Sequence, residues 1–240
     1  FVSETKGSNK ANLTIRSLLL HETGVIAFIP YYAAAIDEKS YSGSLFGKQS
    51  AIYHARYAGS WGRTDYKFLP ELISTRESEQ FYLPVAKGLY ASNKMHDKLL
   101  KEVIDTPLSR KGSYRYSCLN FMLLKEAVES VSGTDLDTYV KQNFYYKLGA
   151  STTTFQPLKH IPIERIPATE NDPFFRKQHV RGYVHDEGAA LFGGISGNAG
   201  LFSNANDLAK LYQMWLNGGE YGGERYLSEE TVRLVTRTKS

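Results

Sequence analysis

Residues 114–120 read Tyr-Arg-Tyr-Ser-Cys-Leu-Asn and open the most regular helical pattern in the chain. A glycine, Gly133, follows the last turn of that pattern. Apolar residues at a spacing of three or four predict a helix with one buried face, and a glycine just beyond them is a common helix end. The run therefore places a tyrosine and a serine at the N-terminal end of a buried helix. The apolar positions are Leu119, Met122, Leu123 and Ala127.

The tyrosine at this helix start suggests proton transfer. The hydroxyl of Tyr116 is expected near backbone N–H groups and the positive end of the helix dipole. Nearby cations would lower its pKa further, as a general base requires. The alternative is that Tyr114 and Tyr116 are ordinary packing aromatics in a chain with 17 tyrosines. Cys118 has two interpretations as well, because a thiol at a helix N-terminus can be reactive, whereas most free cysteines are inert packing groups.

The composition is that of a globular chain. It has 240 residues, of which 42% are hydrophobic and 22% are charged, with a formal net charge of +4. This charge is too small and too dispersed to indicate nucleic-acid binding, and no apolar run reaches the length of a membrane span. The single cysteine excludes an internal disulfide. With no initiator Met and no signal peptide, we expect an excised piece of a longer protein.

Helices dominate the rest of the pattern. We expect them at about 14–24, 92–104, 134–149 and 204–218, with a last one from 228. Residues 25–75 follow no clean period and are expected to be irregular, with a loop at 59–62 and other short helices or strands. Residues 150–180 are expected to be loop and short strand. No long alternating strand stands out, so the sequence predicts a helix-rich α+β chain.

Three other segments suggest chemistry, and each has a simpler explanation. Ser3 and Lys6 spell Ser-x-x-Lys, but a glycine follows at once, so no helix is expected to present the pair. The consecutive residues His185, Asp186 and Glu187 point in different directions and are expected to form hydrogen bonds rather than a metal site. The glycine-rich residues 193–200 lack nucleotide-loop spacing and are expected to form a tight turn beside a substrate cleft. We therefore expect no cofactor and no metal.

Four segments lie in the order found in one known family. Residues 13–24 resemble the segment I-T-I-R-H-L-L-T-H-T-S-G, and Tyr116-Ser117 falls on a Tyr-Ser/Ala-Asn motif. Residues 148–155 resemble a PLGM…T.F segment, and residues 193–208 resemble Gly-Gly-Leu-x-Ser-Thr-x-x-Asp-Leu. Together they resemble the serine β-lactamase and penicillin-binding-protein family, in its class C-like and esterase-like branch. Residues 184–203 are particularly similar to the serine-hydrolase domain fused to family-three glycoside hydrolases in Bacteroidetes.

The resemblance implies a helical lobe and an antiparallel sheet flanked by helices, with a cleft between them. It implies hydrolysis of a β-lactam, a peptidoglycan stem peptide or a small ester through an acyl-serine intermediate. Tyr116 would be the general base and acid partner, and Ser117, Cys118 and Asn120 would contact the substrate. Cys118 stands where the family usually has Asn or Asp, which contacts substrate and the catalytic lysine. Peptidoglycan chemistry also implies a periplasmic or cell-surface location.

Two motifs of the family are not found at their usual places. The family has a helical Ser-x-x-Lys before the segment at 13–24, and a Lys/His-Thr-Gly strand after the segment at 193–208. We therefore expect residues 1–240 to be one β-lactamase-like domain truncated at both ends, with the helical lobe and part of the sheet lobe. Such a chain is expected to be inactive alone, and its exposed apolar surface would support a homodimer.

Three hypotheses follow. The first is a fragment of a serine acyl-hydrolase. The second is a non-catalytic cell-wall binding or interaction module that kept the cleft, which Cys118 motivates. The third is an enzyme that uses Cys118 as nucleophile with His21 or His185 as base, although no Cys–His pairing is readable from the sequence.

Overall fold

The computed structural model describes residues 2–109 and 112–237. Its helices are α1 Ile15–Leu19, α2 Tyr31–Ala35, α3 Asn93–Asp105, α4 Cys118–Ser132, α5 Leu136–Val140, α6 Glu187–Leu191, α7 Ala205–Leu216 and α8 Glu229–Thr236. Single 3-10 turns lie at Ser3–Thr5, Glu38–Ser40, Pro157–Lys159 and Ile163–Arg165. The strands are β1 Phe46–Gly47, β2 Ala55–Tyr57, β3 Ser60–Gly62, β4 Ile73–Ser74, β5 Phe81–Ala86, β6 Leu89–Ser92, β7 Ala168–Asp172, β8 Gln178–Arg181, β9 Glu220–Tyr221 and β10 Glu224–Arg225.

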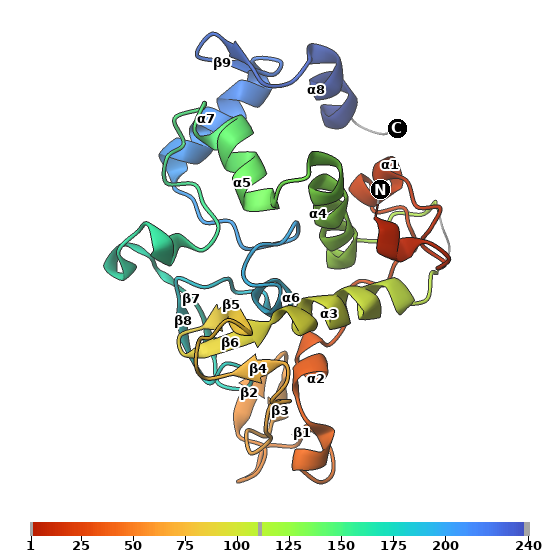
Figure 1. The fold of residues 1–240 in the computed structure, drawn as a ribbon, viewed down its shortest axis with the longest axis vertical. Coiled ribbons are helices and arrows are strands. Elements are labelled where there is room, and N and C mark those ends of the chain that lie inside the picture. Colours follow the sequence, from red (N-terminus) through yellow and green to blue (C-terminus); the bar gives the residue numbers. More distant parts are fainter. Residues whose placement is uncertain (1, 110–111, 238–240) are drawn as a thin grey trace.

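The elements separate into a helical end and a strand-rich end. Figure 1 shows α5, α7 and α8 toward one end, the strands β1 to β8 toward the other, and α3 crossing between them. The helix α4 lies in the middle, beside α1. This arrangement confirms the helix-rich α+β class expected from the sequence. None of the helices in the described ranges is long and apolar enough to cross a membrane.

Helix α4 confirms the helical pattern that begins at residue 118. Leu119, Met122 and Leu123 are buried on one face. The helix ends at Gly133, whose φ of 67° is left-handed and whose N–H donates to the carbonyl of Glu129. Glycine adopts this conformation without steric cost, which fixes the end of the helix.

The caps of the other helices are partly as expected. Thr14 and Ser17 form a capping box before α1, and Asn204 and Ser228 cap α7 and α8 through their side chains. The helix predicted over 134–149 differs in its regularity. It is capped by Asp135, which accepts from the N–H of Thr138 at 2.9 Å, and after α5 it widens into a π-helical turn at Lys141–Tyr145.

All the strand pairs are antiparallel, in small sheets of order β1-β3-β2, β4-β6-β5, β7-β8 and β9-β10. The loop predicted at 59–62 is wrong, because Ser60–Gly62 form the central strand of the first sheet. The hairpin of β5 and β6 was not expected either. Its Pro84 lies on an edge strand, where a missing N–H is tolerated, and Gly88 supplies the left-handed turn residue.

An aromatic cluster forms the core beside the first sheet. Phe174 is fully buried, and its ring lies 4.7 Å from that of Tyr57 and 5.0 Å from that of Phe46. A Cβ on Gly62 would lie 2.4 Å from the Phe174 ring, so only glycine fits at that strand position. This packing joins β1, β2 and β3 to the chain after β7.

Several large apolar side chains remain exposed on α7 and α4. Tyr212 and Leu216 on α7 are 63% and 80% exposed, and Val131 on α4 is 68% exposed. Isolated exposed apolar residues are common in monomers. The homodimer therefore stays a prediction.

The aromatic cluster gives a stability prediction. Phe174→Ala should lower the free energy of unfolding by about 3–5 kcal/mol, because it leaves a cavity where a fully buried ring was. Phe28→Ala is the matched control, since that ring is 64% exposed, and should change stability by about 0.5 kcal/mol or less. Urea denaturation of both variants measures the difference. Equal changes in the two variants would contradict the packing described here.

Candidate functional site

A cavity of about 590 Å³ opens beside the N-terminal end of α4. Tyr116 and Cys118 line it from the start of that helix. The opposite wall comes from the β7 strand and from the first residues of α6. Residues 27–31, 56–58, 116, 118, 170, 172–173 and 185–187 make up the lining.

Tyr116 lies at the mouth of this cavity with its side chain 55% exposed. Its hydroxyl has one hydrogen-bond contact among the described residues, with Sγ of Cys118 at 3.7 Å. The hydrogen bond with Cys118 raises the pKa of Tyr116, and nearby acidic groups, including Asp186, raise it further. The expected lowering by cations is therefore wrong for the described chain, because the groups that shift this pKa are acidic rather than cationic.

Ser117 and Asn120, also predicted at the site, are fully buried. The hydroxyl of Ser117 donates to the carbonyl of Ile26 at 2.6 Å. Residues three apart share one face of a helix, so both side chains turn inward together. The structure brings Tyr116 and Cys118 to the cavity and keeps Ser117 and Asn120 beneath it.

His21, in the segment after α1, contacts the start of α4. Its Nδ1 is 3.2 Å from the backbone nitrogen of Ser117 and 3.1 Å from Nδ2 of Asn120. Its ring packs against those of Tyr116 at 4.8 Å and Phe121 at 5.3 Å. Burial lowers the pKa of His21. The sequence singled out this residue only as a base for Cys118.

The cysteine hypothesis gains no support from these contacts. His21 Nδ1 is occupied by Ser117 and Asn120. His185 is 68% exposed and its Nδ1 lies 3.0 Å from Glu170. Neither imidazole hydrogen-bonds with Cys118 in the described parts of the chain.

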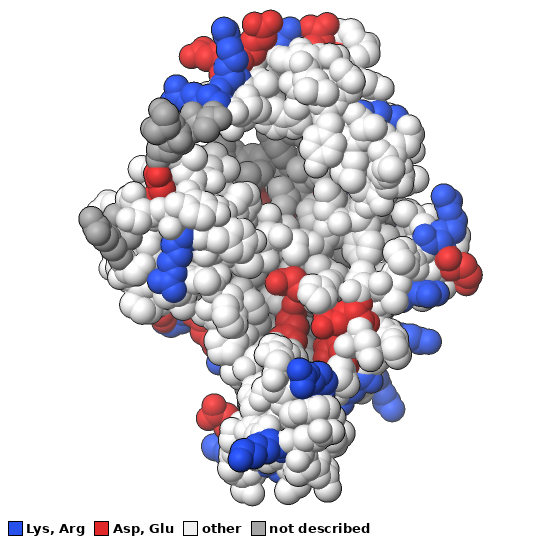
Figure 2. All heavy atoms as spheres, turned by 180° about the vertical axis from the view of Figure 1, so that it is seen from behind, with Lys and Arg blue, Asp and Glu red and all other residues white. Residues whose placement is uncertain are grey.

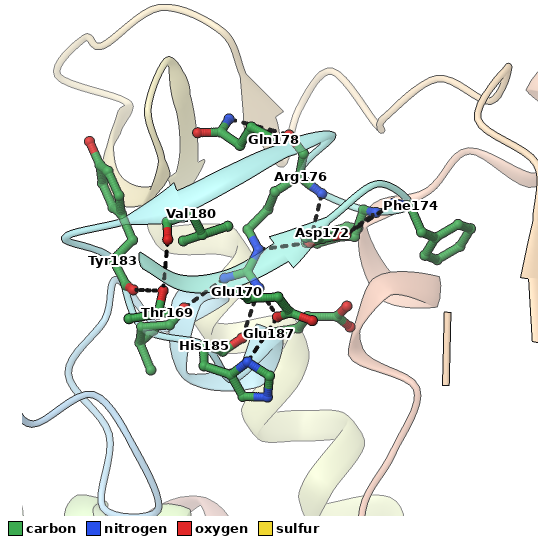
Figure 3. Close-up of polar contacts among 12 residues, drawn as sticks. Thr169, Glu170, Asp172, Phe174, Arg176, Gln178, Val180, Tyr183, His185 and Glu187 are labelled. Atoms are coloured by element: carbon green, nitrogen blue, oxygen red, sulfur yellow. Dashed lines mark hydrogen bonds and ion pairs between the residues drawn. The ribbon is translucent and has the colours of Figure 1, made fainter. Parts of the chain in front are cut away.

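Arg176 joins the segments of the wall that β7 and residues 185–187 form (Figure 3). Its side chain is fully buried, and its guanidinium donates to the carboxylates of Asp172 and Glu170, each at 2.8 Å. It also donates to the carbonyls of Val184 at 2.6 Å and His185 at 2.7 Å. A guanidinium with this many partners fixes the strand β7 and the chain before α6 as one unit.

The three residues 185–187 have separate partners. His185 pairs with Glu170, and Asp186 caps α6 by accepting from the N–H of Ala189 at 2.7 Å. Glu187 accepts from the hydroxyl of Tyr57 at 2.9 Å. No group of three or more potential metal ligands occurs within residues 2–109 and 112–237. The side chains thus lie as hydrogen-bonding groups along one wall.

The cavity lining includes the acidic residues Glu170, Asp172, Asp186 and Glu187. Figure 2 shows Asp and Glu side chains gathered on the rear face, between the central hollow and the strand-rich end. Glu187, on the first turn of α6, also lines the cavity. Burial raises its pKa to about 7, although the hydrogen bond from Tyr57 opposes the shift.

The glycine-rich residues 193–200 pack closely against the backbone of α4 and against one another. A Cβ on Gly197 would lie 2.0 Å from the carbonyl oxygen of Phe121 in α4, and one on Gly200 would lie 2.3 Å from that of Gly194. The tight turn expected here is present. Glycine is required for this close approach to the helix that carries the site.

The only Ser-x-x-Lys of the sequence lies apart from this cavity. Ser3 is part of a one-turn 3-10 helix, Ser3–Thr5, beside α3. Its hydroxyl donates to the carboxylate of Glu4 at 3.0 Å. Lys6 contacts Ser3 through its backbone, whose N–H donates to the carbonyl of Ser3 at 3.0 Å, and no hydrogen bond between the two side chains occurs among the described residues.

Glu187 gives a prediction for the pH dependence of stability. Because its pKa rises from the ordinary 4.5 to about 7 on folding, the folded chain binds more protons than the unfolded chain between these values. The free energy of unfolding should therefore fall as pH rises from about 4.5 to 7, by on the order of 2 kcal/mol from this group. Glu187→Gln should remove that part of the decline in urea titrations. Glu224→Gln, on the exposed strand β10, should keep it, and identical profiles for all three proteins would contradict the assignment.

Comparisons with known proteins agree with this architecture. A sequence profile of the Beta-lactamase family matches residues 1–240. The chain is 42% identical over 166 residues to "Putative D-alanyl-D-alanine carboxypeptidase" of Escherichia coli (strain K12), which covers 63% of this chain and 38% of the relative. A protein of the same name from Salmonella schwarzengrund (strain CVM19633) is 38% identical over 167 residues, or 64% of this chain and 38% of that protein. The chain thus spans 38% of the length of these curated relatives.

Solved structures show the same fold. A penicillin-binding protein from Bacillus halodurans superposes with a TM-score of 0.52 at 16% identity, over 97% of this chain and 54% of the other. D-amino acid amidase from Ochrobactrum anthropi SV3 superposes with a TM-score of 0.50 at 14% identity, over 95% of this chain and 47% of the other. The chain therefore belongs to the Beta-lactamase family, and it has the mixed helical and antiparallel fold of the serine β-lactamases and penicillin-binding proteins.

Proposed function

We propose that this chain supplies one wall of an acyl-transfer site, in which Tyr116 moves a proton during attack by a serine. The observation that carries the proposal is the placement of Tyr116. Its ring packs on a buried histidine, and its exposed side chain lines the cavity at the start of α4. A general base must present its oxygen to the reacting groups while its ring is held in place.

The proposed reaction is hydrolysis through an acyl-serine intermediate. The Tyr116 oxygen takes the proton of a serine hydroxyl as the serine oxygen bonds to the substrate carbonyl carbon. Tyr116 then gives that proton to the leaving amine nitrogen, or to the leaving oxygen of an ester, as the bond from that atom to the carbonyl carbon breaks. In the second half, Tyr116 takes a proton from water as the water oxygen bonds to the acyl carbon. The bond between that carbon and the serine oxygen then breaks, and Tyr116 returns the proton to the serine oxygen.

Peptides ending in D-alanyl-D-alanine are the substrates we favour, with β-lactams as their reactive mimics and small esters as a further class. The support is the name of the relatives that are 42% and 38% identical. Such a substrate would place the protein in the periplasm or at the cell surface.

The nucleophile and its lysine belong, in this proposal, to parts of the parent protein outside these 240 residues. Ser117 is buried, and Ser3 lies on a short 3-10 turn away from the cavity. In this proposal a lysine ammonium brought to the cavity would lower the pKa of Tyr116, which groups of this chain raise. The isolated chain should then hydrolyse nothing.

One observation favours a second candidate, a non-catalytic binding module. Cys118 lines the cavity where the family usually has Asn or Asp, and the only hydrogen-bond contact of its thiol in the described structure is a weak one to Tyr116. A thiol is a poor substitute for an amide that must donate and accept. Stoichiometric acylation of the full-length protein by a β-lactam would exclude this candidate.

Substitution of the tyrosine tests its proposed role. In the full-length protein, Tyr116→Phe should lower the acylation rate by a β-lactam about 10²-fold or more, the usual contribution of a general base. Tyr114→Phe is the matched control, because Tyr114 is a neighbouring exposed tyrosine outside the cavity lining. Stopped-flow acylation of both variants gives the comparison, and an unchanged rate in Tyr116→Phe would remove Tyr116 from the mechanism.

A further inference from the structure

We propose that His21 is a positioning residue for Tyr116, acting as a neutral ring whose Nδ1 accepts two hydrogen bonds from the start of α4. The effect on catalysis rests on the function proposed above. The placement itself does not, because it follows from contacts within the chain.

The direction of the hydrogen bonds fixes the protonation state of His21. A backbone N–H can only donate, so the 3.2 Å contact with Ser117 requires a lone pair on Nδ1. The second contact, from Nδ2 of Asn120, requires the same. A protonated Nδ1 would face two donors, and burial already disfavours the charged ring. The ring is therefore the tautomer with its proton on Nε2.

A short relay sets the orientation of Asn120. The N–H of Val25 donates to Oγ1 of Thr23 at 3.1 Å, and that hydroxyl donates to Oδ1 of Asn120 at 2.8 Å. The amide nitrogen of Asn120 is then left to face His21. The relay runs from the segment after α1 into the first turn of α4, so it ties the two together.

His21 holds residues 115–120 in three ways. Its carbonyl accepts from the N–H of Arg115 at 2.9 Å, its Nδ1 accepts from Ser117 and Asn120, and its ring packs on Tyr116. Its φ of 54° is left-handed, which sets the carbonyl and the ring on the same segment. A histidine can supply the carbonyl, the δ acceptor and the aromatic face together.

Tyr116 depends on this support because little else restrains it. Its side chain is 55% exposed, and its hydroxyl makes only a 3.7 Å contact with a thiol among the described residues. The position of its oxygen therefore follows mainly from the backbone of residues 115–117, which the carbonyl and Nδ1 of His21 hold in place. A displacement of about 1 Å in a reacting group costs on the order of 10²-fold in rate.

The tautomer is tested on the chain as it stands. In a ¹⁵N-histidine-labelled sample at neutral pH, long-range ¹H–¹⁵N spectra should show His21 protonated at Nε2 and bare at Nδ1. The signal is assigned by its loss in His21→Asn. A proton on Nδ1, or a rapid average of both tautomers, would overturn the proposal.

Two variants of His21 separate the role of the Nδ1 acceptor from that of the left-handed backbone at this position. Asn and Gly both tolerate a left-handed φ, but only Asn keeps an acceptor at the δ position. In the full-length protein, His21→Asn should keep the acylation rate within about threefold, and His21→Gly should lose about 10²-fold in rate with little change in the affinity of the first non-covalent complex. Equal rates in the two variants would overturn the role of Nδ1.

The same variants distinguish this inference from the proposed function. If the full-length protein is not acylated at all, the proposed function fails. The positioning role of His21 is then still tested by the position of the Tyr116 ring. Nuclear Overhauser contacts from that ring, assigned with Tyr116→Phe, should persist in His21→Asn and disappear in His21→Gly. Contacts kept in both variants would show that His21 does not position Tyr116.

Discussion

The hydrogen bonds between the segment after α1 and the start of α4 are the constraint on which the site depends. Residues 21–27 lie along residues 115–120, and the carbonyls of His21, Ile26 and Ala27 accept from Arg115, Ser117 and Cys118. His21 Nδ1 completes the contact from inside. Because buried backbone groups must find partners, the two segments fix each other, and the first turn of α4 cannot shift alone. Tyr116 and Cys118 project from this fixed frame into the cavity.

A second buried group fixes the facing wall. Arg176 joins β7 to the residues before α6, and Asp172 in turn accepts from the backbone N–H groups of Phe174, Phe175 and Arg176. Removing one partner of such a buried pair usually costs several kcal/mol, because the other charge is left without compensation. The cavity thus lies between two walls that are each set by buried polar contacts. No group of three or more potential metal ligands occurs in the part of the chain that the structure describes.

Much of the helical framework could be predicted from the sequence, because apolar spacing and capping residues act locally. Helices α3, α4, α7 and α8 follow their patterns closely. The β5–β6 hairpin was missed, because neither strand alternates regularly between buried and exposed residues. The strand at 60–62 was missed because its glycine is needed for packing against Phe174 rather than for a turn.

The site was predicted in part. The helical position of Tyr116 follows from its sequence run, but the inward direction of Ser117 and Asn120 depends on partners about 90 residues or more away, Ile26 and His21. The importance of His21 was missed for the same reason. One signal was present: the histidine lies in the segment at 13–24 that resembles the family, three residues before a glycine. Arg176 gave no local signal, since its role arises only when β7 and the chain before α6 come together.

The most direct measurement is the mass and position of an acyl adduct after incubation with a fluorescent penicillin. It should be made on this chain and on the full-length protein, followed by peptide mapping. The account predicts one adduct on the full-length protein, on a serine outside residues 1–240, and none on this chain. An adduct on Ser3, Ser117 or Cys118 of this chain would contradict the account, because the nucleophile would then lie within these residues.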